Sequence, residues 1–295
     1  MELRQLEYFV SAAELANLTR VAERHFVSQP NISVAIQKLE QELGVQLFER
    51  KKKNFCLTAE GRIFLERIRP ALLILNNSVA ELKDYRKKNS GTIVLGIPPM
   101  ISSFLFSPLL KHFRTQYPEM ELSVVEEGSY GLQDRLATGE IDIGILITND
   151  APSSLNIIPL MTQQHLVCMS KQHPLAQKMS IEWEDLADEP LIVMKNDSYH
   201  RRVIIHECEK RGISTHIFLS SNKIQTNINL VAKGEGISFI LEAVDLNKSD
   251  VITRRMSEPT YVTIGIAWKK EKYLSYAANT LIEFIEKYIK GHFIK

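Results

Sequence analysis

The residues best suited to chemistry in this 295-residue chain are hydrogen-bonding side chains grouped in one stretch, residues 29–43. Apolar residues recur there at helical spacing, with Ile32, Ile36 and Leu39 on one face. The opposite face carries amide, small and basic side chains: Gln29, Asn31, Ser33, Val34, Gln37 and Lys38. Amides can bond adenine edges, a small apolar group can touch the thymine methyl, and Lys can reach phosphate or guanine. The pattern predicts a helix that reads the major groove of DNA, although an ordinary solvent-exposed helix would carry similar residues.

Start and stop signals bound this helix and place a shorter one before it. Ser28 is a good N-cap, and Pro30 falls in the first turn, where its missing amide would have no helical partner anyway. Gly44 follows as a C-terminal stop. Asn17 can cap the shorter helix, which ends before the segment 25–28. Two such helices in succession are typical of a helix-turn-helix.

A cluster of positive charge follows, between two short apolar strands. It consists of four consecutive cations: Arg50, Lys51, Lys52 and Lys53. Like charges in a tight turn repel one another, and a phosphate backbone would neutralise them, with a solvated surface loop as the alternative. Residues 1–89 hold 15 Lys and Arg against 11 Asp and Glu, whereas residues 90–295 hold 21 against 24. A basic end on a slightly acidic body fits a head that binds a polyanion.

Residues 58–89 fit one long helix with an apolar residue at every third or fourth position. The seam consists of Leu65, Ile68, Leu72, Leu75, Val79 and Leu82. Its period of about 3.5 residues is that of a coiled coil, which predicts that two chains pair here. The alternative is that the helix buries this seam on its own core. Pro70 lies inside the helix, where it should remove one backbone hydrogen bond.

Beyond residue 90, strand-like apolar runs alternate with helical patterns, which is typical of an α/β fold. Ligands in such folds bind beyond the carboxyl ends of the strands. Ser102 and Ser103 stand near a helix start after the strand Thr92–Ile97. Their hydroxyl groups, the free amides and the helix dipole could bind an anion there. The alternative is that one of the two serines only caps the helix.

Composition and motifs argue against several functional classes. Fractions of 44% hydrophobic and 24% charged residues are ordinary for a folded globular protein. The first residues show no signal-peptide pattern and no run of about 18 apolar residues occurs, so we expect a cytoplasmic protein without a membrane span. The three cysteines lack metal-ligand spacing, and zincin, Walker and nucleophile-elbow motifs are absent. We therefore expect no cofactor, no metal site and no enzyme activity.

The N-terminal motifs together carry a family resemblance. They are Leu6-Glu7-Tyr8-Phe9, Leu18-Thr19-Arg20-Val21-Ala22-Glu23, Val27-Ser28-Gln29-Pro30-Asn31-Ile32-Ser33, Ile36-Gln37-Lys38-Leu39-Glu40, Leu43-Gly44-Val45-Gln46-Leu47-Phe48-Glu49-Arg50 and Leu57-Thr58-Ala59-Glu60-Gly61. In this order they resemble the winged helix-turn-helix of LysR-type transcriptional regulators. Val34 departs from the family, many members of which have Arg or Lys there, and Asn31 departs where alanine is common. Residues 90–290 are more loosely similar to the effector domain of the same family.

The resemblance implies an architecture in three parts. Residues 1–58 would form an all-α winged helix-turn-helix, and residues 59–89 a linker helix that dimerises. Residues 90–295 would form a two-lobed α/β effector-binding domain like a type 2 periplasmic binding protein. Lobe I would comprise residues 91–162 and 261–295, and lobe II residues 163–260.

The resemblance also implies two sets of contact residues. The DNA-binding set is Thr19, Arg20, Ser28, Gln29, Pro30, Asn31, Ser33, Val34, Gln37, Lys38, Arg50, Lys51, Lys52 and Lys53. The effector-binding set, assigned from strand ends, is Pro99, Met100, Ser102, Ser103, Ser129, Ile147, Asp197, Ser198, Tyr199, His200, Ser221 and Asn222. His200, beside Arg201 and Arg202, could help to bind a carboxylate, unless these three are ordinary surface charges.

The partners implied are double-stranded promoter DNA, a small anionic metabolite as effector, a second or further copies of the chain in a homodimer or homotetramer, and RNA polymerase when the protein activates. A solute-binding protein for transport would share the two-lobed body. It would have no use for the basic head, which favours the regulator.

Overall fold

The computed structural model describes residues 1–51, 54–85, 91–246 and 250–293. The chain divides into two compact units, Met1–Lys83 and Asp84–Lys295, and each is described by itself. Within the described residues, no helix combines the length and the apolar character that crossing a membrane requires.

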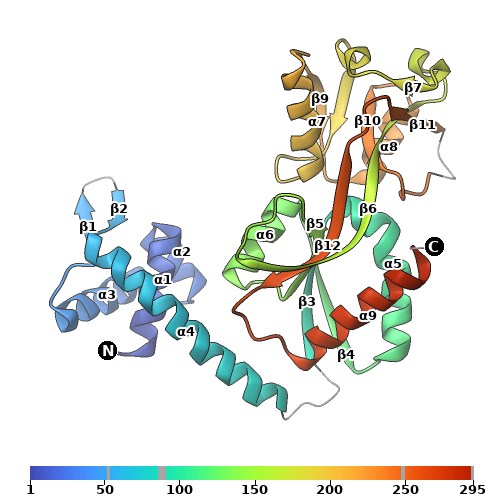
Figure 1. Cartoon of the computed structure of the whole chain (residues 1–295). Helices are drawn as coiled ribbons and strands as arrows, with labels where there is room; N and C mark the ends of the chain where they lie inside the picture. Colours follow the sequence, from blue (N-terminus) through green and yellow to red (C-terminus); the bar gives the residue numbers. More distant parts are fainter. Residues whose placement is uncertain (52–53, 86–90, 247–249, 294–295) are drawn as a thin grey trace. The chain divides into compact units, whose positions relative to one another are not determined.

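The N-terminal unit is a helical bundle with a small hairpin. Its elements are α1 (Leu3–Leu15), α2 (Leu18–Arg24), α3 (Gln29–Leu43), β1 (Phe48–Lys51), β2 (Asn54–Leu57) and α4 (Ala59–Tyr85), the last of which runs two residues into the second unit (Figure 1). The core is aromatic at its centre, where the ring of Phe9 lies 5.4 Å from that of Phe48 and 5.2 Å from that of Phe64. Helix α1, the hairpin and the long helix α4 therefore share one core.

All four predicted end signals, Asn17, Ser28, Pro30 and Gly44, stand at the predicted helix ends. The Asn17 side chain accepts hydrogen bonds from the amides of Thr19 and Arg20, at 2.9 and 3.2 Å. Gly44 ends α3 with a left-handed φ of 70°, a conformation that glycine adopts without steric cost. Ser28 stands at the N-cap of α3, as predicted, although its hydroxyl makes no capping hydrogen bond there. Its backbone carbonyl closes the first turn instead, by accepting from the Asn31 amide at 3.1 Å.

A buried carboxylate ties the hairpin to α3. Glu40 is 8% exposed, and its Oε1 accepts hydrogen bonds from the amides of Leu47 and Phe48, at 2.8 and 3.1 Å. Gly61 closes the other side, since a Cβ there would lie 2.1 Å from the Leu47 carbonyl oxygen. The Glu40 side chain thus fixes the hairpin against α3, and the absence of a side chain at Gly61 lets α4 approach it closely.

The predicted seam of α4 divides into two halves. Leu65, Ile68 and Leu72 pack on the core of their own unit, as the alternative interpretation proposed. Leu75, Val79 and Leu82 are 45%, 46% and 70% exposed. Only this second half of the seam is available to another chain.

The second unit is a ten-stranded mixed sheet that carries two lobes. Its elements are β3 (Gly91–Ile97), α5 (Pro99–Gln116), β4 (Met120–Glu126), α6 (Ser129–Thr138), β5 (Ile143–Ile147), β6 (Leu155–Ser170), a 3-10 turn (Pro174–Gln177), β7 (Ser180–Ile181), a second 3-10 turn (Trp183–Leu186), β8 (Pro190–Val193), α7 (Tyr199–Lys210), β9 (His216–Ser220), α8 (Ile224–Ala232), β10 (Ile237–Leu241), β11 (Val251–Met256), β12 (Tyr261–Lys269) and α9 (Tyr276–His292). The strand order is β4-β3-β5-β12-β6-β10-β8-β9, with β11 between β6 and β7. The α/β prediction is confirmed.

Two long strands join the lobes. The first half of β6 pairs with β12, and its second half pairs with β10 and β11. In Figure 1, β6 and β12 run side by side between the lobes. The first lobe contains β3, β4 and β5, and the second contains β8, β9 and β10. Helices α5 and α9 pack together on the first lobe, while α6 contacts its strands β3, β5 and β12. Any movement of one lobe against the other must bend β6 and β12.

We predict that Glu40→Met loosens the hairpin, because two buried amides then lose their acceptor, at a cost of roughly 1–3 kcal/mol each. Hydrogen exchange of the Leu47 and Phe48 amides should accelerate by at least an order of magnitude. Glu40→Gln keeps one acceptor oxygen and should give an intermediate rate. Gln41→Met, at the exposed neighbouring position, is the matched control, and equal rates in all variants would contradict the role of Glu40.

Candidate nucleic-acid interface and ligand cleft

One face of α3 is buried and the other is open. Ile32, Ile36 and Leu39 are buried beside Val21 and Ala22 of α2. The residues predicted to read bases or to approach the backbone lie on the open side: Thr19, Arg20, Ser28, Gln29, Pro30, Asn31, Val34 and Lys38 are exposed, and Ser33 and Gln37 are partly buried. The helix-turn-helix therefore leaves most of these predicted contact residues open to solvent.

The turn between α2 and α3 is held from inside. The Ser11 hydroxyl lies 2.8 Å from Nε2 of His25, and the Tyr8 ring packs edge-on against the same imidazole, with centroids 4.9 Å apart. Burial lowers the pKa of His25, with Glu7 acting in the opposite direction. The His25 imidazole thus joins the turn to α1 through Ser11 and Tyr8, and the sequence pattern gave no sign of it.

The predicted wing is an antiparallel hairpin. Strands β1 and β2 pair from Phe48 opposite Leu57 to Lys51 opposite Asn54. Arg50 and Lys51 belong to β1. Their contacts with phosphate stay a prediction. The predicted contacts of Lys52 and Lys53 lie outside the described residues.

The start of α5 differs from the prediction. The helix begins at Pro99 with Pro98 as N-cap, so neither Ser102 nor Ser103 caps it. Ser102 donates its hydroxyl to Glu126 at 2.5 Å and its amide to the Pro98 carbonyl at 2.8 Å, while the Ser103 hydroxyl donates to the Met100 carbonyl at 2.7 Å. An anion would find no free amide at Ser102 and a carboxylate beside it. The reason is that the helix starts three residues earlier than the serines suggested.

Three of the other four predicted ligand residues of this lobe belong to its packing. Met100 is 1% exposed in the hydrophobic core, which corrects its placement on the cleft, while Pro99 is partly buried at the helix start. Ser129 is buried at the first position of α6, and its hydroxyl accepts a hydrogen bond from the Ile147 amide at 3.3 Å. Ser129 and Ile147 therefore fix α6 to the end of β5.

Asp197 joins the two lobes. Its Oδ2 accepts a hydrogen bond from the Gly128 amide at 2.7 Å, and its carbonyl accepts from the Tyr130 amide at 3.1 Å. Nδ2 of Asn222 lies 3.4 Å from both carboxylate oxygens of Asp197. Oδ1 of Asn222 accepts a hydrogen bond from the backbone amide of Lys195 at 3.0 Å. A Cβ on Gly128 would meet the Asp197 carbonyl oxygen at 2.3 Å. We call these contacts of Asp197 with Gly128 and Tyr130 the lobe latch.

An aromatic contact lies beside the lobe latch. The guanidinium of Arg202, on α7, lies 3.7 Å from the centre of the Tyr130 ring, on α6. The Tyr130 hydroxyl donates to Asp150, and burial, followed by that carboxylate, raises the pKa of Tyr130 to about 12. The ring of Tyr199 lies 6.1 Å from that of Tyr130. A cation–π contact of this kind adds a second link between the lobes.

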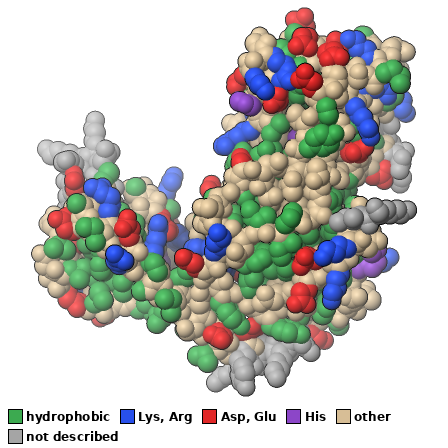
Figure 2. All heavy atoms as spheres, viewed as in Figure 1, with side chains coloured by type: hydrophobic (Ala, Val, Ile, Leu, Met, Phe, Trp, Pro, Cys, Tyr) green, Lys and Arg blue, Asp and Glu red, His purple; other side chains and the backbone are tan. Residues whose placement is uncertain are grey.

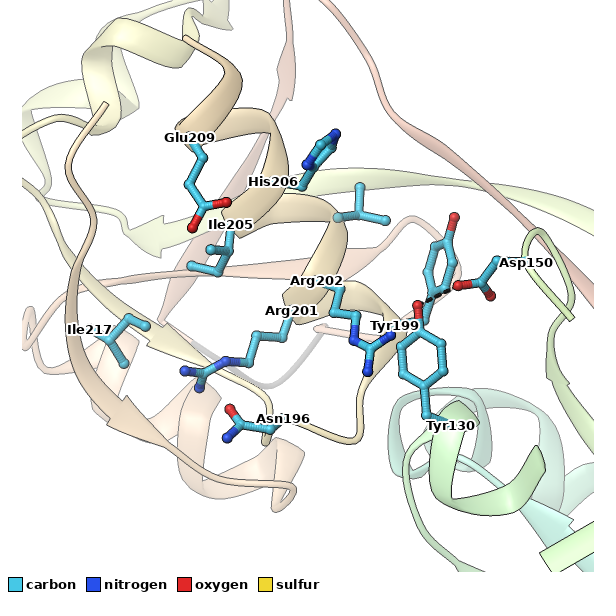
Figure 3. A pocket seen from close by; sticks show the side chains of 11 residues that line it. Tyr130, Asp150, Asn196, Tyr199, Arg201, Arg202, Ile205, His206, Glu209 and Ile217 are labelled. Carbon is cyan, nitrogen blue, oxygen red and sulfur yellow. Dashed lines mark hydrogen bonds between the residues drawn. The ribbon is translucent and has the colours of Figure 1, made fainter. Parts of the chain in front are cut away.

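A pocket of about 600 Å³ opens next to these residues. It is lined by Tyr130, Asp150, Asn196, Tyr199, Arg201, Arg202, Val203, Ile205, His206, Glu209 and Ile217 (Figure 3). Arg201 is held in place by donating to the Met194 carbonyl at 3.2 Å and the Ser220 hydroxyl at 2.6 Å. Of the predicted effector residues, only Tyr199 lines this pocket. The sequence signal for it was the pair Arg201-Arg202, whereas nothing marked Tyr130 or Asp150.

The remaining predicted residues of the second lobe are engaged internally. Ser198 is buried at the N-cap of α7, and its carbonyl accepts from the Arg202 amide at 3.4 Å. The Ser221 hydroxyl accepts from the Lys223 amide at 3.1 Å, just before α8.

Over this lobe, Figure 2 shows Lys and Arg side chains interspersed with Asp and Glu. The drawn face of this lobe has no broad area of a single charge.

His200 is a buried neutral imidazole rather than a surface charge. It is 3% exposed and His165 is fully buried. Nε2 of His165 lies 2.8 Å from Nδ1 of His200, and Nδ1 of His165 lies 2.9 Å from the Thr260 hydroxyl. Burial lowers the pKa of His165 to about 4 and lowers that of His200 well below its usual value. The prediction of a charged carboxylate-binding His200 is therefore corrected.

Comparison with known proteins gives the family. Residues 3–62 match the bacterial regulatory helix-turn-helix proteins of the lysR family, and residues 86–290 match the LysR substrate binding domain. The chain belongs to the LysR family of transcriptional regulators. Its predicted identity and its DNA-binding and effector-binding domains are confirmed.

Individual LysR-type proteins match over most of the chain. The regulator YybE of Bacillus subtilis is 30% identical, covering 99% of both chains, and AlsR of the same organism is 33% identical, covering 88% of this chain and 86% of AlsR. The solved structure of a full-length OxyR variant from Pseudomonas aeruginosa superposes with a TM-score of 0.64 at 27% identity, and the match covers 98% of this chain and 95% of that one. The matches thus include both units of this LysR-type regulator.

We predict that Gly128→Ala opens the lobe latch, because the new methyl group would overlap the Asp197 carbonyl. The effector-binding domain should lose about 1–3 kcal/mol of unfolding free energy, as overpacked sites do, and small-angle scattering should show an expanded domain. Gly291→Ala is the control, since a Cβ there meets nothing within 4 Å. Identical scattering and stability in Gly128→Ala and the wild type would refute the latch.

We predict that the effector-binding domain loses stability as the pH falls from 6.5 to 4. Unfolding releases His165 to its ordinary pKa of 6.5, whereas the folded pKa is about 4, so the unfolded state binds more protons in this window. The loss from His165 alone is on the order of 3 kcal/mol, and His200 adds to it with the same sign. Thermal unfolding of His165→Gln should depend less steeply on pH, and exposed His216→Gln should leave the slope unchanged.

Proposed function

We propose that this LysR-type regulator binds double-stranded promoter DNA with α3 in the major groove and the hairpin β1–β2 on the phosphate backbone. The single observation that carries the proposal is the division of α3 into a buried apolar face and an open face of amide and hydroxyl groups. Such a surface can form hydrogen bonds to base edges. Residues 1–58 would act as the DNA-binding domain, within the cytoplasm.

Two copies would pair through α4, in the linker of residues 59–89. The exposed row Leu75, Val79 and Leu82 supports this, because it continues the 3.5-residue period beyond the part that α4 buries on its own unit. A two-fold dimer would read a pseudo-palindromic site, and two dimers could form a homotetramer. Contact with RNA polymerase would follow on promoters that the protein activates.

The effector would be a small anionic metabolite that binds between the lobes of residues 90–295. Support comes from the lobe latch, in which the Asp197 carboxylate of one lobe accepts the Gly128 amide of the other. A ligand anion would compete with Asp197 for that amide, and the equilibrium between lobe arrangements would shift by its differential affinity for them. The paired heads would then fit DNA differently. The protein would act as a switch and not as a catalyst.

A thiol-based oxidant sensor is the second candidate, because matched relatives include hydrogen peroxide-inducible genes activators. Reactive cysteines need an accessible thiolate. Cys168 and Cys208 are fully buried, and burial raises their pKa to about 12 and about 11. Cys56 is exposed, but it belongs to the hairpin of the DNA-binding unit. These environments favour a non-covalent effector.

The test is base-specific binding. We expect Gln29→Ala with Ser33→Ala to weaken binding to the natural operator by roughly 1–3 kcal/mol per lost base contact, and to change binding to random duplex far less. Fluorescence anisotropy at physiological salt, with the full-length protein on both DNAs, measures this difference.

Gln41→Ala provides the control, because Gln41 is exposed near the far end of the same helix. It should bind both duplexes like the wild type. Equal losses on operator and random DNA in the double variant would refute base reading by α3.

A further inference from the structure

Two histidines meet at a second pocket, between α5 and α9 of the first lobe. His112 lies in the second half of α5 and His292 is the last residue of α9, and these two helices pack together (Figure 1). The centres of the two imidazole rings are 5.6 Å apart. Both rings line a cavity of about 340 Å³ that shares no residue with the pocket beside the lobe latch. The pair is therefore separate from the proposed effector cleft.

Hydrogen bonds fix the same tautomer in both rings. Nδ1 of His112 lies 2.8 Å from the Pro108 carbonyl oxygen, and Nδ1 of His292 lies 2.9 Å from the Tyr288 carbonyl oxygen. A carbonyl oxygen only accepts, so each Nδ1 must carry a proton. In the neutral ring Nε2 then has a free lone pair, and neither Nε2 has a hydrogen-bond partner among the described residues. Both neutral rings thus keep an unprotonated nitrogen that is free to bind.

Histidine adopts this arrangement when it binds a metal ion. A metal-binding imidazole usually donates its other ring N–H to a backbone carbonyl or a carboxylate, which fixes the ring and its tautomer. Two imidazoles that coordinate one tetrahedral ion through Nε2, with metal–nitrogen bonds of about 2.0–2.1 Å, have their centres roughly 5 Å apart. The observed 5.6 Å is close to that separation. The two rings are therefore near enough to share one ion.

Tyr288 holds the two rings in place. Its ring stacks on that of His292 at 4.2 Å with the planes 18° apart, and it lies 5.2 Å from the ring of His112. Tyr288 is buried, and burial raises the pKa of its hydroxyl, which stays protonated. Tyr288 therefore restricts the movement of the imidazoles and does not compete with them as a ligand.

The rest of the pocket leaves room for water ligands. Glu283 and Lys287 of α9 also line it, so that one negative and one positive charge border the cavity. Among the residues that the structure describes, no group of three or more His, Cys, Asp or Glu side chains is arranged to hold a metal ion. The protein would therefore supply two nitrogen ligands, and water would complete the shell, since both histidines are exposed. Imidazole ligands select zinc, nickel and copper over magnesium and calcium.

We propose that His112 and His292 bind one divalent transition-metal ion, of the zinc, nickel and copper class, through their Nε2 atoms. The ion would link the end of α9 to α5 and so hold the C-terminal helix on the first lobe. This inference goes beyond the proposed function and does not depend on it. No sequence signal predicted the site, because its two ligands come from opposite ends of the effector-binding domain and share no local spacing.

The first arm of the test needs no metal. NMR of the tag-free, metal-free full-length protein with isotope-labelled histidine side chains reports which ring nitrogen carries the proton. At about pH 8, where a histidine of ordinary pKa is neutral, we expect Nδ1–H and a bare Nε2 at His112 and His292. His216, an exposed histidine of β9, is the internal comparison and should show mainly the Nε2–H form that free imidazole prefers. A proton on Nε2 of either ring of the pair would overturn the proposal.

The second arm titrates the same protein with zinc chloride in a calorimeter. We expect saturable binding that His112→Gln and His292→Gln each weaken at least tenfold, because each variant removes a ligand and even the outer partners of a metal site contribute about that much. His216→Gln removes an exposed histidine elsewhere and should bind zinc like the wild type. Excess magnesium chloride should not displace the zinc, since Mg²⁺ prefers oxygen ligands.

The double variant His112→Gln with His292→Gln tests whether the two rings share one ion. Once one ligand is removed, loss of the second should weaken zinc binding little further, so the two single effects should not add. Zinc should also raise the thermal midpoint of the wild type but not that of the double variant. Equal zinc affinity in the wild type and the single variants, or strictly additive losses, would overturn the proposal. Both side chains are exposed, so neither substitution removes a core residue.

Discussion

The 2.7 Å hydrogen bond from the Gly128 amide to the Asp197 carboxylate sets how the two lobes of the effector-binding domain meet. The start of α6 needs an acceptor for its free amides, and the opposite lobe supplies one. The approach is possible only because residue 128 is glycine, since any side chain would overlap the Asp197 backbone. Tyr130 and Arg202 extend the contact, and β6 and β12 make the only covalent crossing among the described strands. In the proposed switch, an effector anion would replace Asp197 as the acceptor of the Gly128 amide.

In the DNA-binding unit, too, a few buried contacts hold the elements in place. Its core orients α3, but a single carboxylate, Glu40, decides where the hairpin begins. The close approach at Gly61 then fixes the start of α4. Helix α3 and the hairpin are therefore placed by the same small set of buried groups, while most of the predicted contact residues of α3 are exposed.

The long helix shows how one pattern can serve two purposes. A 3.5-residue period describes the whole seam, yet Leu72 belongs to the core of its own unit and Leu82 is largely exposed. Periodicity reports that a face is apolar, and it does not report what covers that face. The core of the N-terminal unit covers only the first half of the seam, because α4 extends beyond that core.

The sequence by itself determined the elements whose cause is local. Helix-turn-helix, hairpin, long helix and α/β body follow from periodicity, caps and turn residues, and Asn17 and Gly44 act as their types predict. Tertiary structure alone decided the ligand cleft. Ser102 faces Glu126, Met100 is in the core, and His200 pairs with His165 across 35 positions of sequence. Caps and periods depend on neighbours along the chain, whereas burial and hydrogen-bond partners depend on segments that only folding brings together.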